Sequence, residues 1–311
     1  MPLNSQVHSS KPLENISVAF ANQAFIANML SPNVPVKHET DTYYVYSKNS
    51  LMLPDTLRAD GAVSREASFN LSTASYTVKQ HSLSDLITER KRQNADPAID
   101  LERDTTEYLT EKIMMRKEYD VLTAIGTKSN WAQEYSLTST FAWSANTTLS
   151  NPIDIALSAG SAIARNSGYL PNVCAIDYGT FLALKKHVSI VDRIKYTQVD
   201  SVTESLLARL FEVGKVLVSR AVYNTAEEGM ADSMSFMMTD CAWFGYVAPA
   251  PGLKKVSALY TFVTTNANNS PMSVKKWRDD ERGGDKVEVS HMYQHKVVAS
   301  DAAFYIGNTI Q

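Results

Sequence analysis

Residues 97–126 read PAIDLERDTTEYLTEKIMMRKEYDVLTAIG, and this stretch carries the strongest periodic signal in the chain. Asp96 suits the N-cap position, Pro97 the first helical position and Gly126 the end of a helix. At 1.5 Å per residue the helix would be about 45 Å long, whereas a globular helix usually has about 11 residues. The pattern therefore predicts a long spine helix. Its apolar residues form two stripes, namely Leu101, Tyr108, Met115 and Leu122 with Tyr119 beside them, and Leu109, Ile113, Val121 and Ile125.

The chain before the spine is extended rather than core-forming. Residues 1–35 contain four prolines and are typical of an arm. Residues 36–46, VKHETDTYYVY, end in a strand-like aromatic cluster. The next stretch, residues 47–84, is too polar for a core, and its alternating return limb predicts a two-stranded finger with a tip at 54–68. A hairpin of this length is marginal in isolation, so it is either a mobile loop or an arm that becomes ordered on a neighbouring subunit.

After the spine, the predicted secondary structure changes twice along the chain. Residues 151–252 alternate between helical and strand patterns, which predicts an α/β lobe. Residues 253–311 are rich in strand patterns again. There, Gly283 and Gly284 separate two alternating limbs, which predicts a β-hairpin.

Composition indicates an ordinary globular protein and narrows its partners. The 311 residues are 44% hydrophobic and carry a net charge of −3, which argues against a dedicated nucleic-acid-binding protein but is compatible with weak local contact. Cys174 and Cys241 have neither disulfide nor metal-site spacing, and fit buried thiols in a reducing cytosol. The sequence has no apolar run near the ~20 residues of a membrane span.

No catalytic, cofactor-binding or metal-ligating set is predicted from the sequence, because the phosphate-loop, dinucleotide, nucleophile-elbow and zinc motifs are absent from it. His291 and His295 lie in an alternating strand pattern, where four residues span about 13 Å, so we expect ordinary sheet histidines. The acidic residues around Gly283 and Gly284 indicate a solvated hairpin tip rather than a calcium site. The basic cluster ERKR at 89–92 is expected to form salt links between subunits or to be solvated.

The order of these elements resembles tailed-bacteriophage major capsid proteins, whose fold is shared with encapsulin shells and the floor of herpesvirus capsids. Four stretches are similar to that family. They are residues 31–66 with the LRADGA turn, 94–122 at the start of the spine, 170–197 in the α/β lobe and 274–306 at the closing hairpin.

The resemblance implies an α+β fold divided as in that family. The expected parts are an N-terminal arm (1–46), an extended E-loop finger (47–84), a peripheral domain with the spine helix (85–150, helix 97–126), an axial α/β domain (151–252) and closing strands of the peripheral domain (253–311). In this family the finger lies across an adjacent subunit. The expected interface residues are Tyr43, Tyr44, Tyr46, Leu57, Arg58, Phe69, Tyr76, Arg90 and Arg92.

The implied function is a non-enzymatic shell protein of the virion, made in the host cytoplasm. It would self-assemble through hexamers and pentamers around phage double-stranded DNA, which it would contact without sequence specificity. The implied partners are a portal protein, a decoration protein and a separate scaffolding protein, since no room remains for a scaffold segment before the finger. No membrane partner is expected.

Two alternatives and one departure accompany this reading. The alternatives are an encapsulin-type compartment with protein cargo and an α/β enzyme with an inserted β arm. Some capsids of this fold join subunits through a lysine at the finger tip. Residues 54–68 contain no lysine, and Lys48 and Lys79 lie toward the base of the finger, which argues against such a cross-link.

Overall fold

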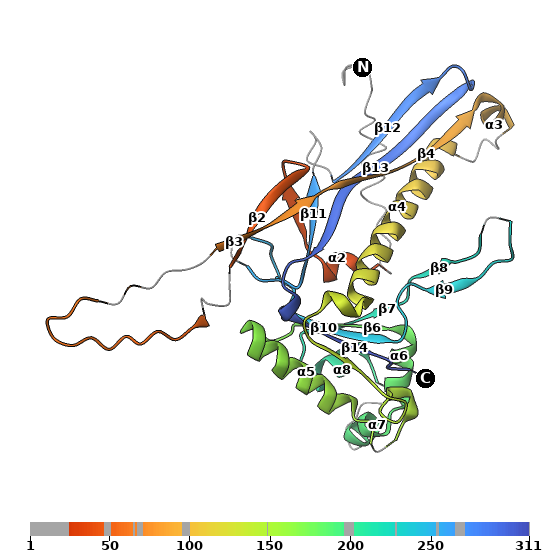
Figure 1. The fold of residues 1–311 in the computed structure, drawn as a ribbon. Helices are drawn as coiled ribbons and strands as arrows, with labels where there is room; N and C mark the ends of the chain where they lie inside the picture. The colour runs from red at the N-terminus through yellow and green to blue at the C-terminus, as the bar shows by residue number, and fades with distance from the viewer. Residues whose placement is uncertain are drawn as a thin grey trace.

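The computed structural model describes residues 25–46, 51–64, 66, 71–94, 100–147, 149–195, 202–227, 229–252, 255–264 and 271–310. These residues form a mixed α+β fold in which two five-stranded sheets are joined along the long helix α4 (Leu101–Gly126). In Figure 1, α4 runs from the upper sheet down to the lower one, while two hairpins project to opposite sides.

Helix α4 confirms the predicted spine and corrects its start. It begins at Leu101 rather than at residue 97, and the side chain of Asp100 caps it by accepting the backbone N–H of Arg103. Asp96 and Pro97 lie outside the described residues. The second predicted stripe, with Leu109 and Ile125, is buried, whereas Tyr108 of the first stripe is exposed. The true buried face also contains Thr106, Thr110, Lys117 and Glu118, which a hydropathy pattern assigns to solvent.

The first sheet packs against the amino-terminal half of α4. Its strand order is β1 (Asn33–Val36), β11 (Leu259–Thr264), β13 (Gly284–Val297) and β12 (Met272–Asp279), and β4 (Lys79–Thr88) also pairs with β13. The predicted hairpin is confirmed, since β12 and β13 pair in antiparallel register from Asp279 opposite Gly284. Leu109 and Ile113 of α4 pack on Ile87, Val274 and Val289 of this sheet.

The second sheet has the order β5 (Glu134–Ser136), β14 (Ala303–Gly307), β10 (Cys241–Gly245), β6 (Val173–Asp177) and β7 (Lys215–Ser219). Every residue of β6 is buried because the strand packs on both faces. Ile176 faces the cluster with helix α5 (Pro152–Ser167), and Ala175 faces the cluster with α4. Helices α6 (Tyr178–Lys186), α7 (Val188–Ile194) and α8 (Glu204–Leu210) lie with α5 below the sheet in Figure 1.

Two strands do not follow the predicted division of the chain. The division placed residues 85–150 and 253–311 with the peripheral part, but β5 and β14 belong to the second sheet. β14 returns there because it pairs with β10 over Ala303 to Gly307 and buries Ile306 in the same cluster as α5. The closing segment therefore serves both sheets.

Two further hairpins and two short helices lie outside the two five-stranded sheets. Strands β2 (Thr40–Tyr46) and β3 (Leu71–Thr77) form one antiparallel hairpin, and β8 (Val222–Asn224) and β9 (Met234–Phe236) form another. Two short helices, α2 (Ala27–Leu30) and α3 (Glu89–Asn94), lie at opposite ends of α4. In the described part of the chain, no helix is both long and apolar enough to cross a membrane.

Candidate functional site

The β2–β3 hairpin is firmly attached to the first sheet at its base. The buried ring of Tyr76 stacks on Phe262 with the ring centroids 4.4 Å apart, and Tyr43 packs against the same ring at 5.5 Å. The backbone N–H of Thr77 donates to Oε1 of Gln294 at 2.6 Å. The strand at residues 40–46 thus finds its partner strand in its own chain, and the base of the hairpin is anchored to the first sheet.

The tip loop (residues 51–64) extends far from the body of the protein (Figure 1). It is locally ordered, because Ala62 N–H donates to the carbonyl of Ala59 at 3.1 Å and Gly61 adopts a φ of 76°. Arg58 adds hydrogen bonds to the Ala62 carbonyl and to the Ser64 hydroxyl. These internal hydrogen bonds give the tip loop a defined turn conformation.

The tip loop exposes large apolar side chains that its own chain does not cover. Leu53 is 97% and Leu57 is 84% exposed, and Leu51, Met52 and Val63 are exposed with them. Burying such a side chain contributes about 1.5–3 kcal/mol, and contiguous exposed apolar groups mark interaction sites. The described residues of this chain therefore leave the apolar side chains of the tip loop in water.

The structure places the predicted interface residues differently from one another. Tyr44, Leu57 and Arg90 are exposed. Arg58 lies in the exposed tip loop, and Tyr46 pairs with Leu71 in the β2–β3 hairpin. Tyr43, Tyr76 and Arg92 make contacts within this chain. Phe69 lies outside the described residues.

Arg92 belongs to an ion-pair network at the tip of the β12–β13 hairpin. Its Nη2 lies 2.7 Å from Oδ2 of Asp285 and 2.9 Å from Oε1 of Glu102, and Lys276 also reaches Glu102 at 2.6 Å. The hydrogen bond from Arg92 lowers the pKa of Asp285. The network ties α3, α4 and the hairpin together, so Arg92 is engaged within its own subunit.

A buried charged pair on α4 was not identified from the sequence. Glu118 accepts the backbone N–H groups of Ile26 and Ala27 at 3.0 and 2.8 Å. Lys117 Nζ donates to Oδ1 of Asn28 at 2.7 Å and of Asn33 at 3.1 Å. Burial raises the pKa of Glu118 and lowers that of Lys117 to about 8. The pair anchors residues 26–33 to the spine, and the only sequence signal was two charges inside an apolar stripe.

The histidines of β13 face this polar centre. His291 and His295 flank Tyr293, whose ring stacks on His81 of β4 with centroids 4.2 Å apart. Burial lowers the pKa of both β13 histidines to about 3, so they are neutral at neutral pH. Among the described residues no group of three His, Cys, Asp or Glu side chains could hold a metal ion.

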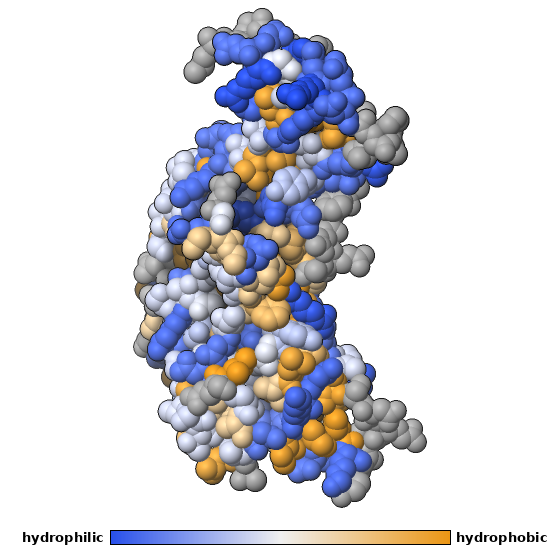
Figure 2. Space-filling view, turned by 90° about the vertical axis from the view of Figure 1, so that its right-hand side faces the viewer, coloured by the Kyte–Doolittle hydropathy of each residue, from blue (hydrophilic) through white to orange (hydrophobic). Residues whose placement is uncertain are grey.

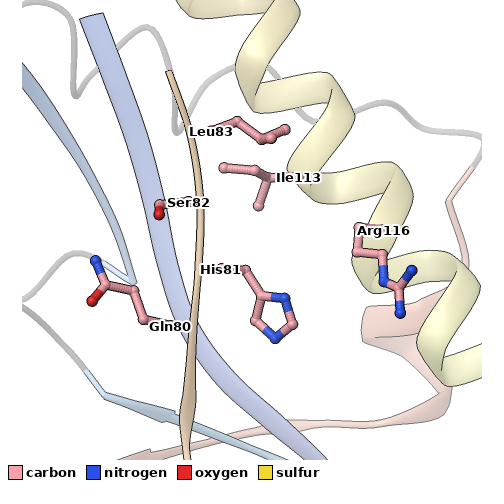
Figure 3. A pocket seen from close by; sticks show the side chains of 6 residues that line it. All are labelled: Gln80, His81, Ser82, Leu83, Ile113 and Arg116. Atoms are coloured by element: carbon pink, nitrogen blue, oxygen red, sulfur yellow. The ribbon is translucent and has the colours of Figure 1, made fainter.

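A shallow groove of about 440 Å³ lies between β4 and α4. In Figure 3, His81 and Leu83 point toward the helix, which contributes Ile113 and Arg116. Gln80 and Ser82 complete its lining from the other side of the strand. The lining of the groove combines the apolar side chains of Leu83 and Ile113 with the cationic side chain of Arg116.

Comparison with curated proteins finds two related sequences. The chain is 28% identical over 225 residues to the major capsid protein of Burkholderia phage BcepMu, covering 71% of each chain. It is 24% identical over 306 residues to the major capsid protein of Pseudomonas phage JBD67, covering 96% of each. No model of a known protein family matches the sequence.

Comparison with solved structures finds the same fold. A phage-related protein from Bordetella bronchiseptica RB50 matches with a TM-score of 0.78 at 21% identity, over 97% of this chain and 98% of that one. The capsid of cyanophage P-SCSP1u matches with a TM-score of 0.61 at 11% identity, over 99% and 92%. The SrpI encapsulin of Synechococcus elongatus PCC 7942 matches with a TM-score of 0.56 at 14% identity, over 92% and 88%.

Proposed function

We propose that the chain is a phage major capsid protein with the fold shared by encapsulins, and that it builds the icosahedral head through hexamers and pentamers that enclose double-stranded DNA. It is a structural component of the virion capsid rather than an enzyme, and capsid assembly implies that it self-oligomerises.

The exposed tip loop is the observation that carries this proposal. A surface with Leu53 and Leu57 almost fully in water has no counterpart within its own chain, so it needs a neighbour to cover it. Because the loop projects from one side only, it meets a different surface on the next copy, and such head-to-tail contacts close into rings. Ordering an exposed loop costs conformational entropy, which the buried apolar area offsets on docking.

The parts of the fold take the roles that the family resemblance implies. We assign the first sheet with α4 to the peripheral domain and the second sheet with α5 to α8 to the axial domain. We assign residues 40–77 to the E-loop in place of the expected 47–84, because β2 pairs with β3 while β4 pairs with β13 of the first sheet. Residues 26–36, which α4 and β11 anchor, form the inner end of the N-terminal arm. The absence of lysine from residues 54–68 supports a shell held by non-covalent contacts.

A scaffolding protein, a portal protein and a decoration protein are the further partners in this proposal. A head-to-tail contact produces open helical filaments whenever its rotation does not close, so a separate scaffold would fix the curvature of the shell. A portal would admit DNA at one vertex. With a net charge of −3, the chain would touch packaged DNA only through local basic groups.

An encapsulin-type compartment is the second candidate, and the match to a solved encapsulin is the observation that favours it. Both candidates predict closed shells, and they differ in content. The phage head would hold nucleic acid, while the compartment would hold protein cargo.

Electron microscopy of the chain, expressed with the genes beside its own, tests the proposal. Closed shells or rings of five and six subunits are expected, with the mass of each fraction checked by light scattering. Shells that contain nuclease-protected DNA when produced in infected cells support the head, and shells filled with one protein support the compartment. A monomer under every condition, with and without the neighbouring proteins, would overturn both.

A further inference from the structure

The β8–β9 hairpin (residues 222–236) is apolar on both of its faces. One face packs on the spine, where Tyr223 contacts Tyr119 edge-on with ring centroids 5.2 Å apart. The other face carries Val222 opposite Phe236, with Met234 opposite Asn224. Met234 is 63% exposed and Met230, near the turn, is 72% exposed.

A solvent-facing hairpin would normally carry polar residues on its outer face, because alternate residues point to opposite sides of a strand. This hairpin has only two short strands, which is marginal on its own, and it nevertheless leaves Val222 and Met234, and Met230 near its turn, exposed. Methionine is well suited to an adaptable contact surface because its side chain is flexible and polarizable. On this face Phe236 also packs on Tyr178 of α6, with ring centroids 5.8 Å apart, whereas Val222, Met230 and Met234 remain exposed in the single subunit.

The hairpin and a second exposed apolar spot lie at opposite ends of strands β6 and β7 of the second sheet. Strands β6 and β7 run parallel, and the hairpin follows β7, so it leaves from the edge where both strands end. Tyr169 and Leu170 lie between α5 and the start of β6, so they lie at the edge where both strands begin. Leu170 is 70% exposed. Figure 1 shows the hairpin projecting to the right, and Figure 2 shows apolar residues gathered on the lower half of that side.

The two edges also differ in charge. The hairpin loop carries exposed Glu227 and Asp232, while the opposite edge carries exposed Arg165 at the end of α5 and Lys215 at the start of β7. Glu212 is an opposing acid beside Lys215. The balance is acidic at the hairpin and basic at the α5 edge, so copies that meet head to tail bring unlike charges together.

We propose that the outer face of the β8–β9 hairpin docks on the α5 edge (residues 165–170) of the next copy of this chain, as a second subunit contact besides the tip loop. This inference rests on the proposed shell function. Each subunit would offer its hairpin to one neighbour and its α5 edge to the other, which is the arrangement that a closed ring requires. Met230 and Met234 would cover Leu170 and Tyr169, and Arg165 would face the acidic turn.

Disulfide trapping in assembled particles tests the contact. Met234→Cys combined with Leu170→Cys should give covalent dimers and higher ladders, up to the ring size, on a non-reducing denaturing gel after mild oxidation. Each single variant should give at least tenfold less product. The native thiols of Cys174 and Cys241 are buried and do not interfere. Shells that form normally and stay monomeric on the gel, with both introduced thiols reactive after denaturation, would overturn the contact.

A charge placed on the hairpin gives an independent measurement. Met230→Asp combined with Met234→Asp should leave the thermal midpoint of the free subunit within about 2 °C, because both side chains are exposed. The yield of shells should fall at least tenfold, while the matched Met230→Leu, Met234→Leu variant assembles normally. Full shell yield from the aspartate variant would overturn the inference and leave the shell function intact. Failure of the unaltered chain to form any shell with its assembly partners would overturn both.

Discussion

Single side chains of α4 anchor residues 26–33, and Glu118 makes two of the hydrogen bonds that do so. Its two carboxylate oxygens each accept one backbone N–H, from Ile26 and Ala27. Glu118→Ala would leave both donors buried without a partner, so we expect the free energy of unfolding to fall by about 2–4 kcal/mol. Hydrogen exchange at the two amides should quicken by at least tenfold, whereas Glu111→Ala, on the same helix and partly exposed, should leave it unchanged. Unaltered exchange in the Glu118 variant would show that the bonds do not hold the segment.

His291 makes the stability of the subunit depend on acid pH. Burial, followed by the charges of Lys117, His81 and His295, lowers its pKa to about 3, below the ordinary 6.5. Between these values the unfolded chain binds a proton that the folded chain does not, so stability present above pH 6.5 is lost as the pH falls toward 3. His291→Phe should reduce the slope of unfolding free energy against pH by up to about 1.4 kcal/mol per pH unit in that window.

Urea denaturation of both chains from pH 4 to pH 7 measures this difference. The carboxylates titrate equally in the two proteins, so the difference between their slopes isolates His291. Parallel curves would contradict the assignment of a neutral buried imidazole.

Residue-scale features were only partly predictable from the sequence. The alternation around His291 and His295 correctly placed them in a strand. The same method missed Lys117 and Glu118, because a hydropathy pattern scores a charge as exposed whatever hydrogen bonds await it. Tyr76 was proposed as a contact with a neighbour, yet it is buried against Phe262 of its own chain, since an aromatic ring in a strand suits a core as well as an interface.

At the scale of elements, Gly284 shows why the β12–β13 hairpin tolerates so little change. A Cβ on Gly284 would lie 2.6 Å from the carbonyl oxygen of Ile87 and 2.8 Å from Cα of Thr88, both backbone atoms of β4. Gly284→Ala should therefore push β4 away and lower the free energy of unfolding by about 1–3 kcal/mol. Gly283→Ala, with a φ of 57° but open space around it, should cost about 1 kcal/mol of backbone strain and leave β4 in place.

Amide exchange separates these two glycine variants. Exchange at Ile87 and Thr88 should rise in the Gly284 variant alone. Equal exchange in both variants would mean that the turn, and not the approach of β4, requires the glycine pair.

Elements with strong local signals were predicted well, and those defined by distant partners were not. The long helix and the Gly283–Gly284 hairpin follow from periodicity and turn residues close in sequence. The membership of β5 and β14 in the second sheet depends on strand pairs far apart in sequence, such as Tyr305 with Glu134. A strand of three to five residues carries too short a pattern to specify which sheet it joins.

At the scale of the whole molecule, the β2–β3 and β8–β9 hairpins project to opposite sides of the two sheets and α4 (Figure 1). The core clusters draw mainly on the two sheets, their helices and the base of the β2–β3 hairpin, and none of them includes a residue of the tip loop. In the proposed shell, folding of the subunit and assembly would thus draw on separate sets of apolar residues. The polarity and turn residues of the sequence predicted the finger. They did not predict that Leu53 and Leu57 are exposed, because that depends on which other residues fill the core.

Removing residues 54–68 tests this separation directly. The β2–β3 pairs from Thr40 opposite Thr77 to Tyr46 opposite Leu71 lie outside the deletion, as does the stacking of Tyr76 on Phe262. We therefore expect a folded subunit whose thermal midpoint stays within about 2 °C and which forms no stable shells, as judged by calorimetry and electron microscopy. Leu53→Ser combined with Leu57→Ser keeps the loop length and should lower shell yield at least tenfold, because it removes apolar area that only a neighbour can bury. Normal shells from the deletion would show that assembly relies on other surfaces, and an unfolded subunit would show that the tip loop stabilises its own chain.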